Sequence, residues 1–185
     1  MWGYGIFIDI VRCIGCYACV VGCKNWHMLH NTENSTIKIM DFTTGEFPEV
    51  ERWIIPIFCG QCKNAPCMDV CDTGALFRTE DGIIRIDEEK CIGSRRCERA
   101  CPFGVILFNR EKNKVFKCDF CYDRIKKEQN PFCVDICPTS AIHFEKISEI
   151  EKKSVFSLNK YLGTKIFYPI ITSSLENELI DRIKE

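Results

Sequence analysis

The chain has 185 residues, a formal net charge of −1 and 15 cysteines. A near-neutral charge offers no basic surface for nucleic acid, and no stretch reaches the ~18 apolar residues that a direct membrane span requires. Because the cysteine count is odd and the N-terminus shows no export signal, we expect a cytoplasmic protein whose cysteines bind metal, with export on a signal-bearing partner left open.

The first predicted functional element is group one, a ferredoxin-type run C-x2-C-x2-C-x3-C formed by Cys13, Cys16, Cys19 and Cys23. One such loop reaches three irons of a cubane, and its last cysteine leads to a second cluster. The next segment, 25–58, has little helical periodicity and a Thr44-Gly45 turn. We therefore expect a loop with one β-hairpin there, in a position suited to a partner interface.

Two further groups follow in the middle of the chain. Group two comprises Cys59, Cys62, Cys67 and Cys71, and group three comprises Cys91, Cys97 and Cys101. Between them, the sequences "GALF" and "GIIRID" predict two short strands separated by a turn at Asp81-Gly82. This arrangement predicts a compact ferredoxin-like module at residues 59–109.

Group three lacks one thiol, because "KCIGSRRCERACP" has Ser94 in the second cysteine position of the run. A serine hydroxyl is far less acidic than a thiol and its oxygen is a harder ligand, so iron at this corner should be the most easily lost. Three interpretations stay open. The site holds a [3Fe-4S] cluster, or a [4Fe-4S] cluster whose fourth iron is bound by Ser94 or water, or no cluster.

Group four comprises Cys118, Cys121, Cys133 and Cys137. Structural zinc sites use two C-x2-C knuckles and need no further thiols in this pattern, whereas every group here ends in C-x3-C. In a two-cluster ferredoxin fold, the last cysteine of each run ligates the cluster of the other run. Since groups two and three pair, groups one and four should form an outer module, 1–58 plus 110–147, that the inner module interrupts.

The tail, 148–185, ends in "SSLENELIDRIKE". Apolar residues at helical spacing behind a Ser174 cap predict a short amphipathic helix that packs on the core or docks a partner; they are Leu175, Leu179, Ile180 and Ile183. The three histidines, His27, His30 and His143, are expected to be structural, because cysteine already fills every cluster corner except one.

The order of groups resembles the four-cluster ferredoxin-like iron–sulfur electron-transfer subunits of molybdenum and tungsten oxidoreductases. These include the dimethyl sulfoxide reductase family and subunits associated with tungsten aldehyde oxidoreductases, formate dehydrogenases or hydrogenases. C-x2-C-x4-C-x3-C in group two and C-x2-C-x11-C-x3-C in group four carry the resemblance, which covers about Gly5 to Ile147. Asp72 departs from it, because the family usually has proline there. The resemblance implies an α+β fold of two ferredoxin-like modules of βαβ type, with pseudo-two-fold symmetry and short helices around the clusters.

The resemblance also implies which residues share a cluster. Cluster one takes Cys13, Cys16, Cys19 and Cys137, and cluster four takes Cys118, Cys121, Cys133 and Cys23. Cluster two takes Cys59, Cys62, Cys67 and Cys101, and cluster three takes Cys71, Cys91 and Cys97, with Ser94 at its fourth corner. Three of the four clusters are then [4Fe-4S], and cluster three is [3Fe-4S] or a Ser94- or water-ligated [4Fe-4S].

No residue pattern predicts bond-making chemistry, so we expect no catalytic site on this chain. The expected function is to relay single electrons between a large catalytic subunit, with a molybdopterin- or tungstopterin-type cofactor, and an external partner. That partner would be a ferredoxin, a hydrogenase or a membrane redox subunit. A free-standing polyferredoxin carrier is the alternative, and a maturation or redox-sensing protein is a third interpretation.

Overall fold

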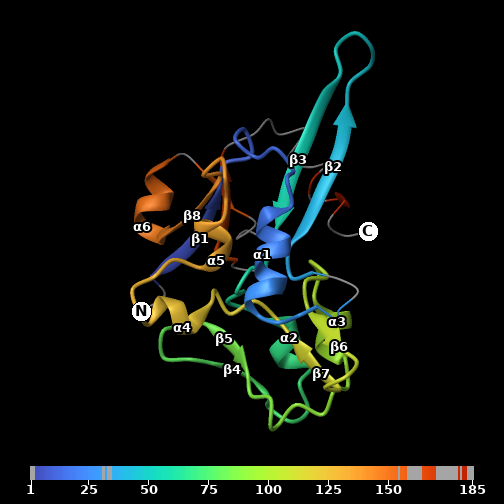
Figure 1. Ribbon diagram of the computed structural model, residues 1–185, viewed down its shortest axis with the longest axis vertical. Helices are drawn as coiled ribbons and strands as arrows, with labels where there is room; N and C mark the ends of the chain where they lie inside the picture. Colours follow the sequence, from blue (N-terminus) through green and yellow to red (C-terminus); the bar gives the residue numbers. More distant parts are fainter. Residues whose placement is uncertain are drawn as a thin grey trace.

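The computed structural model describes residues 3–30, 32, 35–153, 155–157, 164–169, 179 and 181–182. Within these ranges, short helices alternate with four small β-sheets (Figure 1), which confirms the predicted α+β class. None of the helices in the same ranges is long and apolar enough to cross a membrane.

The largest sheet joins the two ends of the sequence. Its strands, in spatial order, are β8 (Ile142–Lys146), β1 (Tyr4–Ile8), β10 (Ile166–Pro169) and β9 (Val155–Ser157). β1 pairs antiparallel with β8 and parallel with β10. Side chains alternate across a strand, and in β1 this alternation buries Ile6 and Ile8 completely. The tail therefore contributes two strands to the core sheet, where the sequence predicted only a helix.

The predicted C-terminal helix lies largely outside the described residues, and its positions Ser174, Leu175, Ile180 and Ile183 are among those not described. The described residues of this segment, 179 and 181–182, are helical. Leu179 is completely buried, and the Arg182 guanidinium lies 4.5 Å from the centre of the Phe42 ring. These contacts place the described part of the helix against the protein core.

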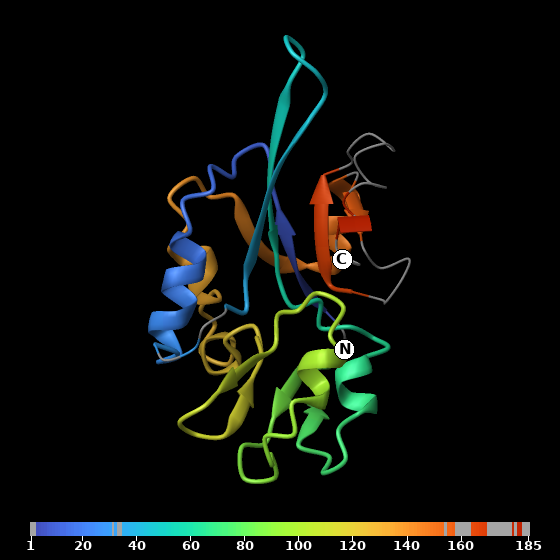
Figure 2. The ribbon, with the colours of Figure 1, turned by 90° about the vertical axis from the view of Figure 1, so that its right-hand side faces the viewer.

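The predicted hairpin of segment 25–58 is present as β2 (Lys38–Thr44) and β3 (Glu51–Ile57), which pair antiparallel. It projects from the rest of the molecule in both views (Figures 1 and 2). Its base is buried at Ile55 and Ile57, and the tip carries Phe47, which is 93% exposed. The hairpin is thus anchored in the core and free at its turn.

The strands predicted between groups two and three are present as β4 (Leu76–Arg78) and β5 (Ile84–Ile86), which pair antiparallel. A further hairpin pairs β6 (Leu107–Asn109) with β7 (Lys114–Phe116). This hairpin spans the predicted module boundary at residue 109. The division of the protein into modules stays a prediction.

A short helix lies at each cysteine group, and these are α1 (Ala18–Trp26), α2 (Pro66–Asp69), α3 (Arg96–Ala100), α4 (Tyr122–Ile125) and α5 (Phe132–Asp135). α6 (Ile147–Ile150) and a 3-10 turn (Glu151–Lys153) follow β8. α1 packs on α5 and α2 packs on α3, which brings groups one and four, and groups two and three, together. Gly22 permits the first of these contacts, because a Cβ there would lie 3.0 Å from the Ile136 side chain.

Candidate metal centres

All four cysteine groups share one backbone feature. The residue directly before the second ligand position has a left-handed φ in each group: 65° at Gly15, 45° at Gln61, 71° at Gly93 and 59° at Phe120. A left-handed residue turns the backbone sharply, which lets one short loop curve around a bound group and aim its N–H groups inward. The same turn in four places indicates four loops of one kind.

Two of these positions require support, because left-handed backbone is unfavourable for residues other than glycine. Gln61 is completely buried, and its side-chain Nε2 donates to the Cys118 carbonyl oxygen at 2.7 Å. Its Oε1 accepts a hydrogen bond from the Ile84 N–H at 2.8 Å. Phe120 is 1% exposed and contacts the Phe144 ring edge-on. Buried contacts thus fix the loops of groups two and four.

The loop that contains Ser94 matches the loop that contains Cys16. Tyr17 has φ 60° and ψ 7°, and Arg95, at the corresponding position of group three, has φ 59° and ψ 12°. Each of these residues begins the helix that carries the next cysteine. Both Cys16 and Ser94 are exposed. The serine therefore stands in a loop of the same conformation as that of an all-cysteine group.

The thiols assigned to cluster one lie near one another. Burial raises the pKa of Cys19 to about 12, and the neighbouring thiolates of Cys13, Cys137 and Cys16 add to the rise. Cys13 also has a raised pKa, caused first by burial and further by Cys137 and Cys16. The last cysteine of group four is thus brought to the loop of group one.

The reciprocal contact is made by Cys23, the last cysteine of group one. Burial raises the pKa of Cys121 to about 12, and Cys23 raises it further. Burial also raises the pKa of Cys118 and of Cys133, and Cys23 contributes to both. Cys23 therefore lies with the first three cysteines of group four.

Groups two and three are brought together in the same way. Burial raises the pKa of Cys62 to about 12, and the neighbouring thiolates of Cys59, Cys67 and Cys101 raise it further. The lining of one small cavity includes all four of these thiols. Cys101, the last cysteine of group three, thus lies with the loop of group two.

A second small cavity includes the cluster three residues in its lining: Cys71, Cys91, Cys97 and Ser94. Burial raises the pKa of Cys97, and Cys71 and Cys91 raise it further. Among the residues that the structure describes, no three His, Cys, Asp or Glu side chains converge on a point that one metal ion could occupy.

Backbone N–H groups solvate the sulfurs at two corresponding positions. Burial acts to raise the pKa of Cys71, but hydrogen bonds from the backbone, at Leu76, Ala75 and Thr73, and from the Thr73 side chain lower it overall. Cys137 shows the same balance, and the Ala141 N–H donates to its Sγ at 3.2 Å. Such donors stabilise a thiolate.

The donor set fits iron–sulfur clusters. Burial disfavours most of these cysteines as free thiolates, so they need positive metal beside them to lose their protons. All fifteen are unpaired by disulfides and are available as ligands. The loops, the reciprocal positions of the last cysteines and the inward N–H groups agree with clusters bound by paired ferredoxin-type runs.

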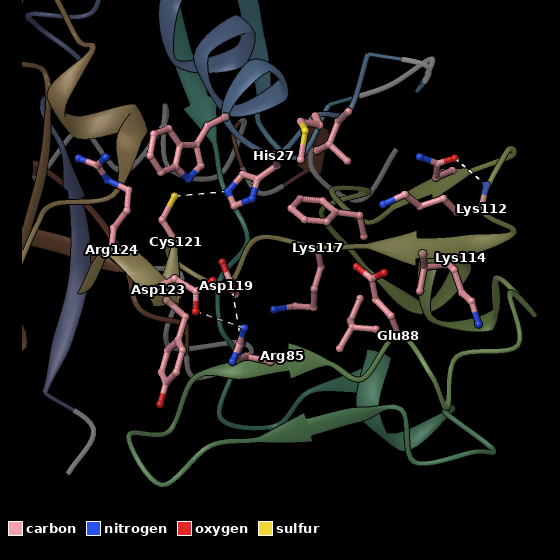
Figure 3. Close-up of a pocket in the computed structure, with 18 residues that line it drawn as sticks. His27, Arg85, Glu88, Lys112, Lys114, Lys117, Asp119, Cys121, Asp123 and Arg124 are labelled. Carbon is pink, nitrogen blue, oxygen red and sulfur yellow. Dashed lines mark hydrogen bonds and ion pairs between the residues drawn. The ribbon is translucent and has the colours of Figure 1, made fainter. Parts of the chain in front are cut away.

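One polar contact to a predicted ligand was not expected from the sequence. The Nε2 atom of His27 lies 3.4 Å from Cys121 Sγ, at the edge of a cavity of about 420 Å³ (Figure 3). Burial lowers the pKa of His27, although Asp119 and Asp123 act to raise it. A sequence signal existed, because His27 follows Cys23 by four residues, which is one helical turn.

Comparisons with known proteins agree with this geometry. Residues 50–147 match the family described as the 4Fe-4S dicluster domain. The sequence is 39% identical over 158 residues to the B subunit of anaerobic dimethyl sulfoxide reductase from Escherichia coli (strain K12), covering 81% of this protein and 77% of the relative. It is 35% identical over 167 residues to the thiosulfate reductase electron transfer subunit from Salmonella typhi, covering 89% and 84%.

A third relative is the formate dehydrogenase-O iron-sulfur subunit from Escherichia coli (strain K12), with 37% identity over 153 residues, 74% of this protein and 51% of the relative. Two of these relatives are named as electron-transfer or iron–sulfur subunits, and the third is named as a subunit of dimethyl sulfoxide reductase. The resemblance inferred from the cysteine spacings is therefore confirmed: this protein belongs to the 4Fe-4S dicluster family of electron-transfer subunits.

Proposed function

We propose that this protein relays single electrons as the iron–sulfur subunit of a larger oxidoreductase, and that catalysis takes place on a partner subunit. The observation that carries the proposal is the reciprocal arrangement of the cysteine groups. The four loops share a left-handed residue before their second ligand position, and the last cysteine of a group lies with the loop of its paired group. The relatives, which are named as subunits of dimethyl sulfoxide reductase, thiosulfate reductase and formate dehydrogenase, support the same role.

The ligand sets follow the assignment made from the resemblance. Cluster one uses Cys13, Cys16, Cys19 and Cys137; cluster two uses Cys59, Cys62, Cys67 and Cys101; cluster three uses Cys71, Cys91 and Cys97; cluster four uses Cys118, Cys121, Cys133 and Cys23. When bound, each cluster supplies one-electron redox chemistry. Cluster three is a [3Fe-4S] cluster or a [4Fe-4S] cluster completed by Ser94 or water, because Ser94 supplies no thiol at that corner.

Contacts between the sets support a linear order of clusters. Cys19 of cluster one is close enough to raise the pKa of Cys133 in cluster four. Cys59 of cluster two likewise raises the pKa of Cys118 in cluster four.

Clusters two and three are also neighbours, because Cys97 of cluster three raises the pKa of Cys67 in cluster two. The order is therefore one, four, two, three, so that clusters one and three lie at the two ends of the relay. Electrons would enter or leave at those ends and pass through clusters four and two between them.

The partner at one end is a catalytic subunit with a molybdopterin- or tungstopterin-type cofactor. The partner at the other end is a ferredoxin, a hydrogenase or a membrane redox subunit, and the location of the complex stays the cytoplasmic one predicted from the sequence. Exposed apolar side chains near cluster one support a permanent interface at that end; they are Val11, Ile14, Tyr17, Val21 and Ile136.

Anaerobic co-expression with a molybdopterin- or tungstopterin-containing catalytic subunit from the same organism tests the function. We expect the two subunits to co-purify, and we expect the partner's cofactor to be reduced through this protein when a low-potential donor is added. A stable monomer that keeps all its clusters, binds no large subunit and carries electrons between soluble partners would instead support the polyferredoxin alternative.

A further inference from the structure

Two side chains from outside the cysteine groups reach the sulfurs of cluster four. His27 Nε2 lies 3.4 Å from Cys121 Sγ, and Thr36 Oγ1 lies 3.1 Å from Cys23 Sγ. The corresponding threonine contacts in clusters one and three are longer, 3.7 Å for Thr139 with Cys137 and 3.9 Å for Thr73 with Cys71. Cluster four thus has the closest side-chain hydrogen-bond partners in the described part of the protein.

The fold holds the His27 ring in this position. His27 directly follows α1, and its backbone N–H donates to the Cys23 carbonyl oxygen at 3.1 Å. Cys23 and His27 are one turn apart and therefore share a face of the helix. The imidazole packs on the Phe116 ring with centroids 5.0 Å apart. Figure 3 shows the ring directed at Cys121 beside the cavity.

The chemistry of a ligand cysteine decides which atom of the contact donates the hydrogen. A metal-bound cysteine is a thiolate and has no proton to donate, so Nε2 must carry the hydrogen. An N–H donor stabilises negative charge on sulfur, and the charge on sulfur is greater in the reduced cluster. A donor at Cys121 therefore favours reduction of cluster four over reduction of the other clusters.

We propose that His27 is a positioning residue for cluster four, whose Nε2–H donates a hydrogen bond to the Cys121 thiolate and makes this centre easier to reduce. The proposal rests on the ligand sets of the proposed function. Thr36 acts in the same direction on Cys23. Cluster four then holds an electron more readily than its neighbours, so that an electron from either neighbouring cluster collects there.

Redox titration of the full-length holoprotein, monitored by electron paramagnetic resonance, tests the proposal. His27→Phe keeps a ring against Phe116 but removes the donor. The donor binds the sulfur in both redox states and more strongly in the reduced one, so only this difference shifts the potential. We therefore expect roughly a tenfold loss in the reduction equilibrium of cluster four, or ~59 mV. The other midpoint potentials should not move, and His27→Gln, which retains an amide donor, should recover part of the shift.

His143→Phe is the matched control, because His143 lies on β8 beside Phe7 and Glu145 rather than a sulfur. It should change no potential. Wild-type protein labelled with isotopic nitrogen in histidine should also show a hyperfine coupling to cluster four, which provides a test that needs no variant.

Two outcomes would overturn the proposal. The first is a His27→Phe protein with full iron content in which the midpoint potential of cluster four is unchanged, or in which the midpoint potentials of all clusters shift equally. The other, decisive if the variant loses its cluster, is the absence of a histidine nitrogen coupling in the wild type. Failure of the ligand sets would look different, because wild-type protein would then lack cluster four altogether. Failure of the relay function would appear as a protein that keeps cluster four, and its histidine coupling, but binds no large subunit.

Discussion

Ser94 is the residue on which the composition of cluster three depends. Its loop has the same left-handed positions as the loop of Cys16, and it lines the same cavity as Cys71, Cys91 and Cys97. A serine therefore stands where group one has Cys16, in a loop of the same backbone conformation. Sequence spacing alone predicted the missing thiol, but the unchanged backbone could not be read from spacing.

If cluster three lacks its corner iron, protein purified without oxygen should contain about 15 irons, from three cubanes and one three-iron cluster. The oxidised protein should also be paramagnetic, because an oxidised [3Fe-4S] cluster has an odd number of electrons. Ser94→Cys should supply the thiolate, add about one iron and remove this signal. About 16 irons in the wild type with no such signal would mean that Ser94 or water binds the fourth iron.

The reciprocal ligands give a second prediction for single residues. Cys137→Ser should damage cluster one, although Cys137 belongs to group four, because its sulfur lies with Cys13, Cys16 and Cys19. Cys23→Ser should damage cluster four and leave cluster one assembled. The two variants serve as controls for each other, and iron content with low-temperature spectra distinguishes the clusters. Loss of cluster four in Cys137→Ser, with cluster one intact, would reverse the assignment.

At the scale of the element, local signals predicted well and long-range pairing did not. Turn residues and strand-forming runs located β2–β3 and β4–β5, because a hairpin pairs residues that are close in sequence. β10 was missed, because its short apolar run is ambiguous by itself and its partner β1 lies at the other end of the sequence. The contact of His27 with Cys121 was also missed, because the two residues are 94 positions apart and the helical spacing of His27 relates it only to Cys23.

The tail strands lead to a prediction about assembly. The Lys165 N–H donates to the Gly60 carbonyl oxygen at 2.7 Å, and Thr164 lies against Gly60, so the tail supports the loop of group two. A protein that ends at Lys153 loses this support and the parallel partner of β1. It also loses three buried side chains, Ile166, Phe167 and Tyr168, at about 1.5–3 kcal/mol each.

We therefore expect the protein ending at Lys153 to unfold at a lower temperature and to lose cluster two before the others. A protein ending at Pro169 keeps β9 and β10 and is the matched control. Thermal unfolding followed by circular dichroism, together with iron content per molecule, makes the comparison. Equal stability and equal iron in the two shortened proteins would show that the tail strands do not support the cluster loop.

For the whole molecule, the proposed linear order of clusters gives two ends with different surfaces. The end at cluster one exposes several apolar side chains around an exposed Cys16, whereas fewer lie at cluster three, where Ile92 is exposed. A permanent complex needs a larger apolar interface than a transient encounter. We therefore assign the catalytic partner to the end at cluster one and the exchangeable redox partner to the end at cluster three.

Ile14 and Ile92 allow a matched test of this assignment. They occupy the same position of loops with the same backbone, and they are 62% and 61% exposed. Ile14→Asp places a charge in the proposed permanent interface, where burying it without a partner is costly, so the catalytic subunit should no longer co-purify. Ile92→Asp should leave that complex intact and slow electron exchange with the external carrier. Both variants should keep full iron content, since both side chains face solvent. Loss of the catalytic subunit in Ile92→Asp, but not in Ile14→Asp, would assign the two ends the opposite way.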